Sequence, residues 1–241
     1  MHTKTRAIVL RSFKYSESQL IIDMLTEEVG RVSFICHVSR SAKARLKPQF
    51  FQPLSLLDLE FDFRPSAGLQ HLREVRVALP FVSIPFEPYK LSMSLFLAEF
   101  LYYCTRDEQR NAPLFSYVMQ SIEWLDRCST HFSNFHLVFM LRLSRFIGFF
   151  PNLDDYRSGD YFDLREGAFC SSAPLHVDYL VPAEARLIGL LMRMDYTTMH
   201  LFRMSQTERN RCIDVLLTFY RLHVPAFPEL KSLAVLRELY L

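Results

Sequence analysis

Glycine is scarce in this chain, with six residues in 241, and there is no Walker A, dinucleotide-binding or G-x-S-x-G motif. The five cysteines are odd in number and form no CxxC pair, which predicts reduced, mostly buried thiols. The longest apolar run, residues 91–104, includes Glu99 and falls short of the roughly 20 residues of a membrane span. The N-terminus lacks a signal-peptide pattern. We therefore expect a soluble, cytoplasmic protein with no membrane partner.

The net charge of +2 neither requires nor excludes a nucleic-acid partner, but its distribution is uneven. Residues 1–50 carry nine cations and four acids, whereas the other 191 residues carry 19 cations and 22 acids. The segment 40–47 has four cations and no acid. It suits a phosphate backbone, because bound cations release condensed counterions. A solvated loop explains the same residues equally well, so both interpretations stay open.

Residues 1–80 show the alternation of apolar and polar residues that is typical of half-buried antiparallel strands. The pattern is clear at 31–38, 57–63 and 73–79, and two more apolar runs lie at 7–10 and 20–25. About five strands predict a small closed barrel, and an OB-fold and an SH3-like barrel fit this pattern equally. Most of the 22 Phe and 11 Tyr are expected in the core.

Helical spacing dominates residues 89–150 and returns from 182, and prolines 80, 85 and 88 before it predict an extended linker. Helices are expected from Leu91, over 114–125, from a Ser133 cap to Gly148, from Pro182, after the capping box Ser205–Glu208 and from Pro228. The polar segment 152–181 predicts a small hairpin that turns at 165–167. The predicted fold class is therefore α+β, with a barrel domain over 1–80 and a mostly α-helical domain over 81–241.

Two groups of residues match metal sites only in part. The acids Asp154, Asp155, Asp160 and Asp163 suit Mg²⁺, but no Lys or His base accompanies them, and turn capping explains them better. Cys170 and His176 are two ligands where structural zinc needs about four. We therefore predict no catalytic residue, no metal ion and no cofactor.

The N-terminal region also contains short motifs in a specific order. They are Thr5–Leu10, Tyr15-Ser16-Glu17, Thr26-x-x-x-Gly30-Arg31 and the basic segment Arg40–Lys47, and segments 51–54, 72–75, 96–99, 133–137 and 148–152 continue the series. This combination covers most of the chain. It resembles the RecO family of recombination mediators in DNA repair, and its style resembles members from Bacteroides-like bacteria.

The resemblance implies an N-terminal OB-fold, a helical C-terminal domain and a role without enzymatic activity. It implies binding to single-stranded and double-stranded DNA, annealing of complementary strands and action at the nucleoid. The implied protein partners are RecR and the C-terminal tail of single-stranded-DNA-binding protein, and together these contacts help to load RecA. Many relatives carry a four-cysteine zinc module, but the corresponding stretch here, 152–181, contains only Cys170.

Two sets of cations are candidate contacts. For DNA phosphates they are Arg11, Lys14, Arg31, Arg40, Lys43, Arg45 and Lys47, beside the candidate stacking residues Phe13, Tyr15, Phe34, Phe50 and Phe51. For the acidic tail peptide they are Arg127, Arg142 and Arg145, because helix cations beside apolar surface receive a terminal carboxylate, although ordinary solvated positions explain these arginines equally well. The alternative function is an OB-like and helical interaction adaptor that does not touch DNA. A metal-dependent nuclease using the acid cluster is a more distant alternative.

Overall fold

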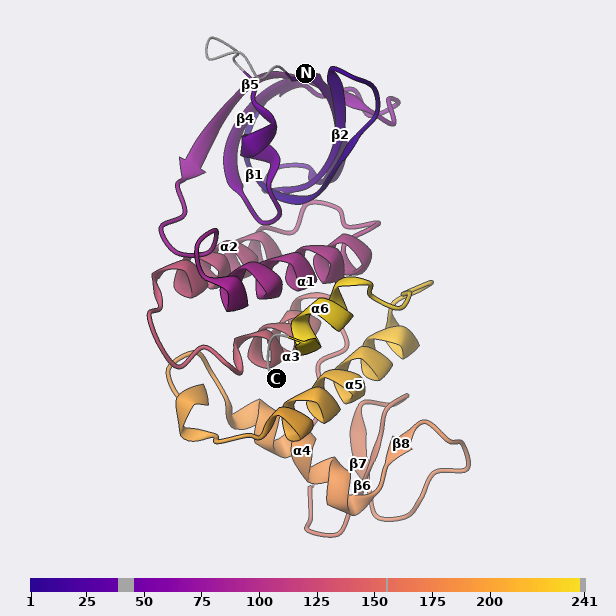
Figure 1. Ribbon diagram of the computed structural model, residues 1–241. Helices are drawn as coiled ribbons and strands as arrows, with labels where there is room; N and C mark the ends of the chain where they lie inside the picture. The colour runs from indigo at the N-terminus through magenta and orange to yellow at the C-terminus, as the bar shows by residue number, and fades with distance from the viewer. Residues whose placement is uncertain (39–45, 155, 239–241) are drawn as a thin grey trace. The chain divides into compact units, whose positions relative to one another are not determined.

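The computed structural model describes residues 1–38, 46–154 and 156–238 (Figure 1). The chain divides into two compact units, Met1–Arg127 with the C-terminal segment from Leu230, and Cys128–Glu229. The first unit therefore holds the barrel together with α1 (Pro88–Cys104), α2 (Ala112–Arg127) and α6 (Ser232–Glu238). The predicted domain limit at residue 80 stays a prediction.

Five strands form a closed barrel, seen end-on in Figure 1. They are β1 (His2–Lys14), β2 (Gln19–Thr26), β3 (Gly30–His37), β4 (Leu56–Asp62) and β5 (Gln70–Leu79). Their order is β1-β2-β3-β5-β4, and β1 pairs antiparallel with both β2 and β4 to close the ring. A short parallel pairing joins β3 to β5. The barrel is thus OB-like, which decides between the two barrels that the sequence left open.

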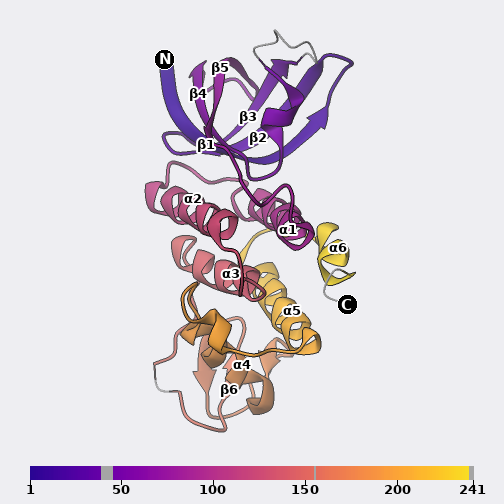
Figure 2. The same cartoon turned by 60° about the vertical axis from the view of Figure 1, so that its left-hand side comes forward.

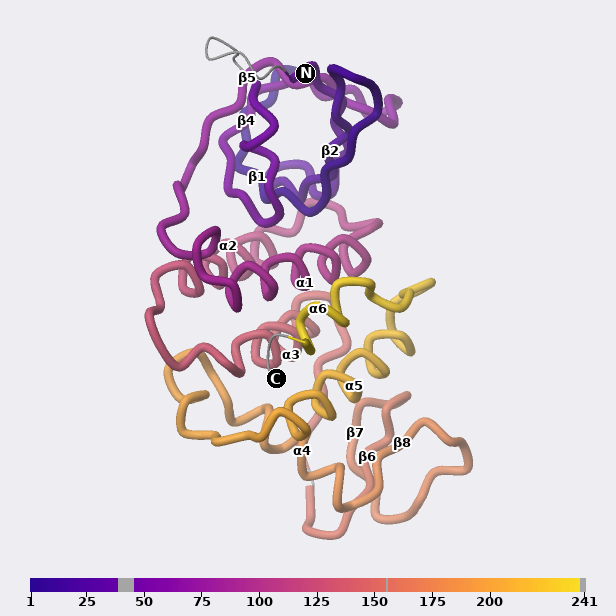
Figure 3. Tube along the Cα trace, in the orientation of Figure 1, coloured from indigo at the N-terminus to yellow at the C-terminus, as the bar shows by residue number. Residues whose placement is uncertain are grey.

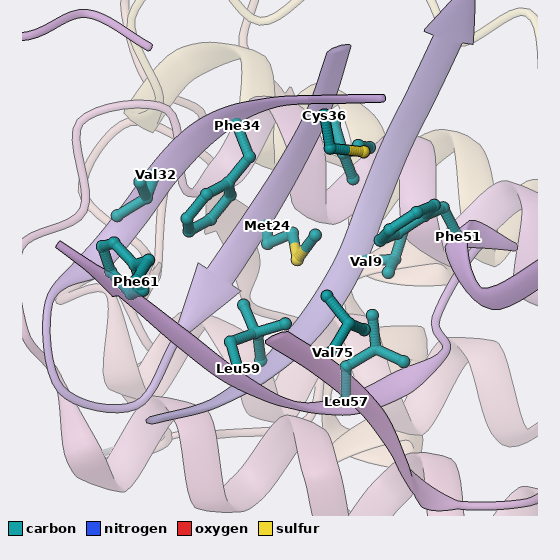
Figure 4. Packing of buried hydrophobic residues seen from close by; sticks show 12 residues of the cluster. Val9, Met24, Val32, Phe34, Cys36, Phe51, Leu57, Leu59, Phe61 and Val75 are labelled. Carbon is teal, nitrogen blue, oxygen red and sulfur yellow. The ribbon is translucent and has the colours of Figure 1, made fainter. Parts of the chain in front are cut away.

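Alternate strand residues fill the barrel, as the periodicity predicts (Figure 4). The rings of Phe34 and Phe61 meet edge to face with centroids 4.9 Å apart. Phe34 and Phe51 are buried in this core, so they are not available to stack on bases. Burial also raises the pKa of the Cys36 thiol to about 12, which keeps that thiol protonated and unreactive.

The run Ala7–Leu10 is buried without alternation because both faces of β1 are covered there, and a β-bulge follows it. The register of β1 against β2 shifts between Val9 and Arg11. Ala7 and Val9 belong to the barrel core, whereas Ile8 and Leu10 are buried outside that cluster, in the strand that packs against α1. Beyond the bulge every residue from Arg11 to Lys14 is exposed.

The proline-rich segment before α1 is fixed in place, so the prediction of an extended linker is wrong. The buried carboxylate of Asp126 in α2 accepts hydrogen bonds from the backbone N–H groups of Val82, Ser83 and Ile84 at 2.8–2.9 Å. Pro88 is not part of a linker but occupies the first turn of α1, where its missing N–H is harmless. The segment therefore joins the barrel to α1 and α2 within one unit.

Helix α6 begins at Ser232 and not at the predicted Pro228, because a carboxylate from α1 sets its start. Glu99 accepts hydrogen bonds from the backbone N–H groups of Lys231 at 3.1 Å and Ser232 at 2.8 Å, and from the Ser232 hydroxyl. These N–H groups lack partners within the helix, so Glu99 acts as a cap supplied from another helix.

The second unit packs α3 (Phe135–Phe146) against α4 (Pro182–Arg193) and α5 (Gln206–His223), as Figures 2 and 3 show. A small sheet of β6 (Tyr161–Asp163), β7 (Ala168–Cys170) and β8 (Tyr179–Leu180) packs its Phe162 on α4 and α5. The predicted hairpin turn at Gly167, the Pro182 start and the Ser205–Glu208 capping box are confirmed. The cap of α3 is Asn134 and not Ser133, and strand β8 was not predicted.

Candidate nucleic-acid interface

The end of β1 and the turn after it expose aromatic and basic side chains together. Tyr15 is 64% exposed and Phe13 is 38% exposed, which is unusual for large rings on a strand. The guanidinium of Arg11 lies 4.8 Å from the centre of the Phe13 ring, and Lys14 follows directly. We call Arg11, Phe13, Lys14 and Tyr15 the β1 strip. Rings and unpaired cations side by side are the groups that bind bases and phosphates.

The cations of the β1 strip differ from other barrel cations in their partners. Four exposed cations on the barrel strands are paired: Lys4 with Glu60 at 2.6 Å, Arg6 with Glu27 at 2.7 Å, Arg76 with Glu74 at 3.3 Å, and Arg73 with Asp62. Arg11, Lys14 and Lys47 have no carboxylate partner among the described residues. Their charge is therefore not neutralised locally and is available to an anion.

Lys14 also lines a groove of about 450 Å³ with one acid, Glu17, and with Ser16, Gln19, Leu20, Val38 and Pro48. Val38 and Pro48 are described residues that flank the basic segment on its two sides. The predicted contacts Arg40, Lys43 and Arg45 lie outside the described residues, whereas Lys47 is described and partly exposed. The structure thus brings Lys14 close to the flanks of the basic segment.

Arg31 does not share this exposure. Its side chain is 9% exposed and lies 3.5 Å from the Asp23 carboxylate, and it donates to the Tyr102 carbonyl at 3.3 Å. Burial, as the largest effect, lowers the pKa of Arg31, and Asp23 opposes that shift. We leave Arg31 out of the proposed phosphate surface because its side chain is buried inside the unit, next to the Asp23 carboxylate.

The Thr26–Gly30–Arg31 motif builds a tight turn and a contact with the chain after α1. The Thr26 hydroxyl donates to the Gly30 carbonyl at 2.8 Å and accepts from the Val29 N–H at 3.2 Å. Gly30 has φ +80°, and the Arg31 N–H donates to the Glu108 carbonyl at 2.9 Å. The motif therefore holds the barrel on this segment, which is a structural role.

Two acids of the predicted cluster cap turns. Asp160 accepts from the Arg157 N–H at 2.8 Å, and Asp163 accepts from the Arg165 N–H at 2.8 Å. These bonds confirm turn capping for Asp160 and Asp163, while Asp155 lies outside the described residues.

A four-thiolate zinc module does not fit the insertion 152–181. The His176 ring lies 3.1 Å from an Asp163 carboxylate oxygen, and burial raises the pKa of the Cys170 thiol, which disfavours the thiolate that zinc needs. The described part of the chain holds no group of three or more His, Cys, Asp or Glu residues placed for a metal ion. Function without zinc stays a prediction.

The three predicted peptide-binding arginines are not brought together within one unit. Arg127 belongs to the first unit and lies 3.9 Å from Glu123 of the same helix. In the second unit, Arg142 donates to the Met194 carbonyl at 2.8 Å, at the C-terminal end of α4. Arg145 lies over the Phe150 ring at 4.4 Å. Arg142 is thus a partner of a helix end, where cations are stabilising.

Comparison with known proteins completes the assignment. The family description "Recombination protein O N terminal" matches residues 1–81, and "Recombination protein O C terminal" matches residues 85–234. Proteins named DNA repair protein RecO are similar over the full length of both chains, with 51% identity in Phocaeicola vulgatus, 52% in Bacteroides fragilis and 32% in Flavobacterium johnsoniae. Among the described residues, no helix is both long and apolar enough to cross a membrane. The chain belongs to the RecO family of DNA repair proteins.

Proposed function

We propose that this chain is a recombination mediator without enzymatic activity that binds DNA through the β1 strip and the basic segment 40–47. Arg11 and Lys14 beside the exposed Phe13 and Tyr15, on an OB-like barrel, carry this proposal. Cations without carboxylate partners bind phosphates and release counterions, and exposed rings stack on unpaired bases. The same surface holds single strands during annealing and, in association with RecR, supports the loading of RecA.

An interaction adaptor that does not touch DNA is the competing function, and the near-neutral net charge of +2 favours it. A titration of labelled oligothymidylate, followed by fluorescence anisotropy at several salt concentrations, separates the two. We expect binding whose logarithm falls linearly with the logarithm of salt, by about 0.7 for each phosphate neutralised. Absence of binding at about 50 mM salt, with and without RecR, would favour the adaptor.

A groove of about 370 Å³ in the second unit suits the acidic, apolar tail of single-stranded-DNA-binding protein. Arg186 and Arg193 line this groove from α4, with Leu187 and Leu190 between them, and Tyr156 and one acid, Glu208, complete the lining with Gly189. Arginines one helical heptad apart lie on the same face, so they offer two donors for carboxylates beside an apolar surface. We propose this groove as the tail site, in place of a site built on Arg127, Arg142 and Arg145.

Calorimetry with the synthetic tail peptide tests that groove. Arg193→Glu reverses the charge at the lining and is expected to abolish the heat of binding. Arg203→Glu, a substitution in the same unit outside the groove lining, is the control and leaves the heat unchanged. Equal heats for both variants would place the peptide elsewhere.

A further inference from the structure

A second hollow in the first unit has no part in the surfaces described so far, except that it shares Arg11 with the β1 strip. Its cavity volume is about 400 Å³, within the range of small-ligand sites. It lies where β1, α1 and the start of α6 meet, and its walls include Arg11, Ser12, Leu95, Tyr102, Tyr103 and Lys231. The lining is thus partly aromatic and partly cationic.

The charges of this hollow favour an anion. Arg11 lies 5.3 Å from the centre of the Tyr102 ring, and neither its guanidinium nor the Lys231 ammonium has a carboxylate partner among the described residues. Glu99 is the one acid in the lining, and its two oxygens already accept hydrogen bonds from Lys231 and Ser232 N–H groups. Two cations against one engaged carboxylate leave the hollow positive.

The aromatic wall favours a flat partner. The rings of Tyr102 and Tyr103 meet edge to face with centroids 4.9 Å apart, and both residues line the hollow. Arg11 stands between this wall and Phe13, because its guanidinium is near both the Tyr102 and the Phe13 ring. A strand that follows the β1 strip therefore reaches the hollow at Arg11.

We propose that this hollow receives one nucleotide of a bound single strand, with the base against Tyr102 and Tyr103 and its phosphate at Arg11 and Lys231. The proposal rests on the proposed function, because it needs a strand along the β1 strip. The site would hold one unstacked base in a fixed position while its neighbours remain on the barrel surface.

Two matched substitutions on α1 test the hollow. Leu95→Glu places a carboxylate in the lining, and Leu91→Glu places the same group one turn earlier, outside the lining. Leu95 is 39% exposed and Leu91 is 43% exposed, so both variants are expected to fold with unchanged melting temperature. Leu95→Glu should weaken binding of a short oligothymidylate about tenfold, the size expected for one stacked base, and Leu91→Glu should not.

A second substitution tests the same site in case Leu95→Glu does not fold. Lys231→Gln removes one exposed cation and should lower the salt slope of binding by about 0.7. Competition with thymidine monophosphate tests whether a single nucleotide is enough. If it displaces the oligonucleotide, a free nucleotide fits the hollow. A failure to displace, with Leu95→Glu still tenfold weaker, shows that the flanking strand is required.

The outcomes separate this proposal from the function on which it rests. If the unmodified protein binds no single strand, the proposed function fails. If it binds, but Leu95→Glu and Leu91→Glu bind equally well and Lys231→Gln keeps the salt slope, the nucleotide site is overturned while DNA binding stands. Binding of the acidic tail peptide that Leu95→Glu abolishes, with DNA binding unchanged, would assign the hollow to a peptide and also overturn it.

Discussion

The guanidinium carbon of Arg31 lies 4.5 Å from the centre of the Tyr102 ring. The contact joins a barrel strand to α1, and the Asp23 carboxylate lies 3.5 Å from the same guanidinium. Arg11 lies near the same ring at 5.3 Å, but it is exposed and has no acid partner among the described residues. Arg31 and Arg11, which both lie near the Tyr102 ring, therefore have different roles. Arg31 is held inside the unit, whereas Arg11 is available to a ligand.

Arg31→Ala is expected to lower the free energy of unfolding by about 2–4 kcal/mol, because it leaves the buried Asp23 carboxylate without its cation. Urea unfolding measures this loss. The salt slope of DNA binding by the folded variant should equal that of the unmodified protein. Arg11→Ala should show the opposite behaviour, with stability kept and the slope reduced. A reduced slope for Arg31→Ala would show that Arg31 contacts phosphate.

Gly30→Ala is expected to destabilise the first unit by about 2–5 kcal/mol. The left-handed φ of +80° strains any side chain, and an added Cβ would lie 2.4 Å from the backbone of residues 108 and 109. Gly68→Ala is the matched control, since its Cβ would meet nothing within 4 Å, and it should change stability by less than about 0.5 kcal/mol. Equal midpoints of thermal unfolding for the two variants would contradict the assigned role of the turn.

His136 is expected to make the stability of the protein depend on pH. Burial, with a smaller effect of Arg209, lowers the pKa of His136 from 6.5 to about 3. The folded state keeps this ring neutral, so its contribution is complete above pH 6.5 and is lost as the pH falls and the unfolded chain takes up the proton. Between about pH 7.5 and 5.5 the loss should be about 1.4 kcal/mol.

Urea unfolding at these two pH values, with matched histidine variants, measures the effect. His136→Gln removes the titrating ring, so its stability should fall less than that of the unmodified protein. His200→Gln removes an exposed histidine and should keep the full dependence. The assignment is wrong if both variants lose stability equally between the two pH values.

Chelation should leave the protein intact. The insertion is packed through Phe162, Leu164 and Leu180 against α4 and α5, so apolar contacts hold it without a metal cross-link. Elemental analysis of protein purified without chelator should find no stoichiometric zinc, and EDTA should not change the melting temperature. Bound zinc together with a lower melting temperature after chelation would refute this prediction.

Sequence pattern predicted local structure well where one face of an element is buried. Period-two alternation predicts β3, β4 and β5, whereas β1 and β2 were visible only as the apolar runs 7–10 and 20–25. The order of the strands around the barrel, in which β3 pairs with β5, depends on contacts between residues far apart in the chain. No local sequence pattern predicts it. The same limit applies to Tyr102 and Lys231, which meet only in the folded unit.

Charge in the sequence does not reveal burial, which is why Arg31 was grouped with Arg11 and Lys14. One signal was present: Asp23 is an acid within an apolar strand, and such a residue needs a buried partner. The linker prediction failed for a similar reason. Its prolines were visible, but the Asp126 carboxylate that fixes the segment comes from α2, about 40 residues later.

The central claim, that the β1 strip binds single-stranded DNA through cations that lack carboxylate partners, is tested most directly by comparing two double variants. Arg11→Ala with Lys14→Ala removes two unpaired cations, and Arg73→Ala with Arg76→Ala removes two cations that are paired with Asp62 and Glu74. Both lower the net charge by two, so only the position of the charge differs.

The quantity to measure is the slope of log affinity against log salt for oligothymidylate. We predict that the first variant lowers the slope by about 1.4 and weakens binding, while the second leaves both close to those of the unmodified protein. Equal slopes for the two variants would contradict the account.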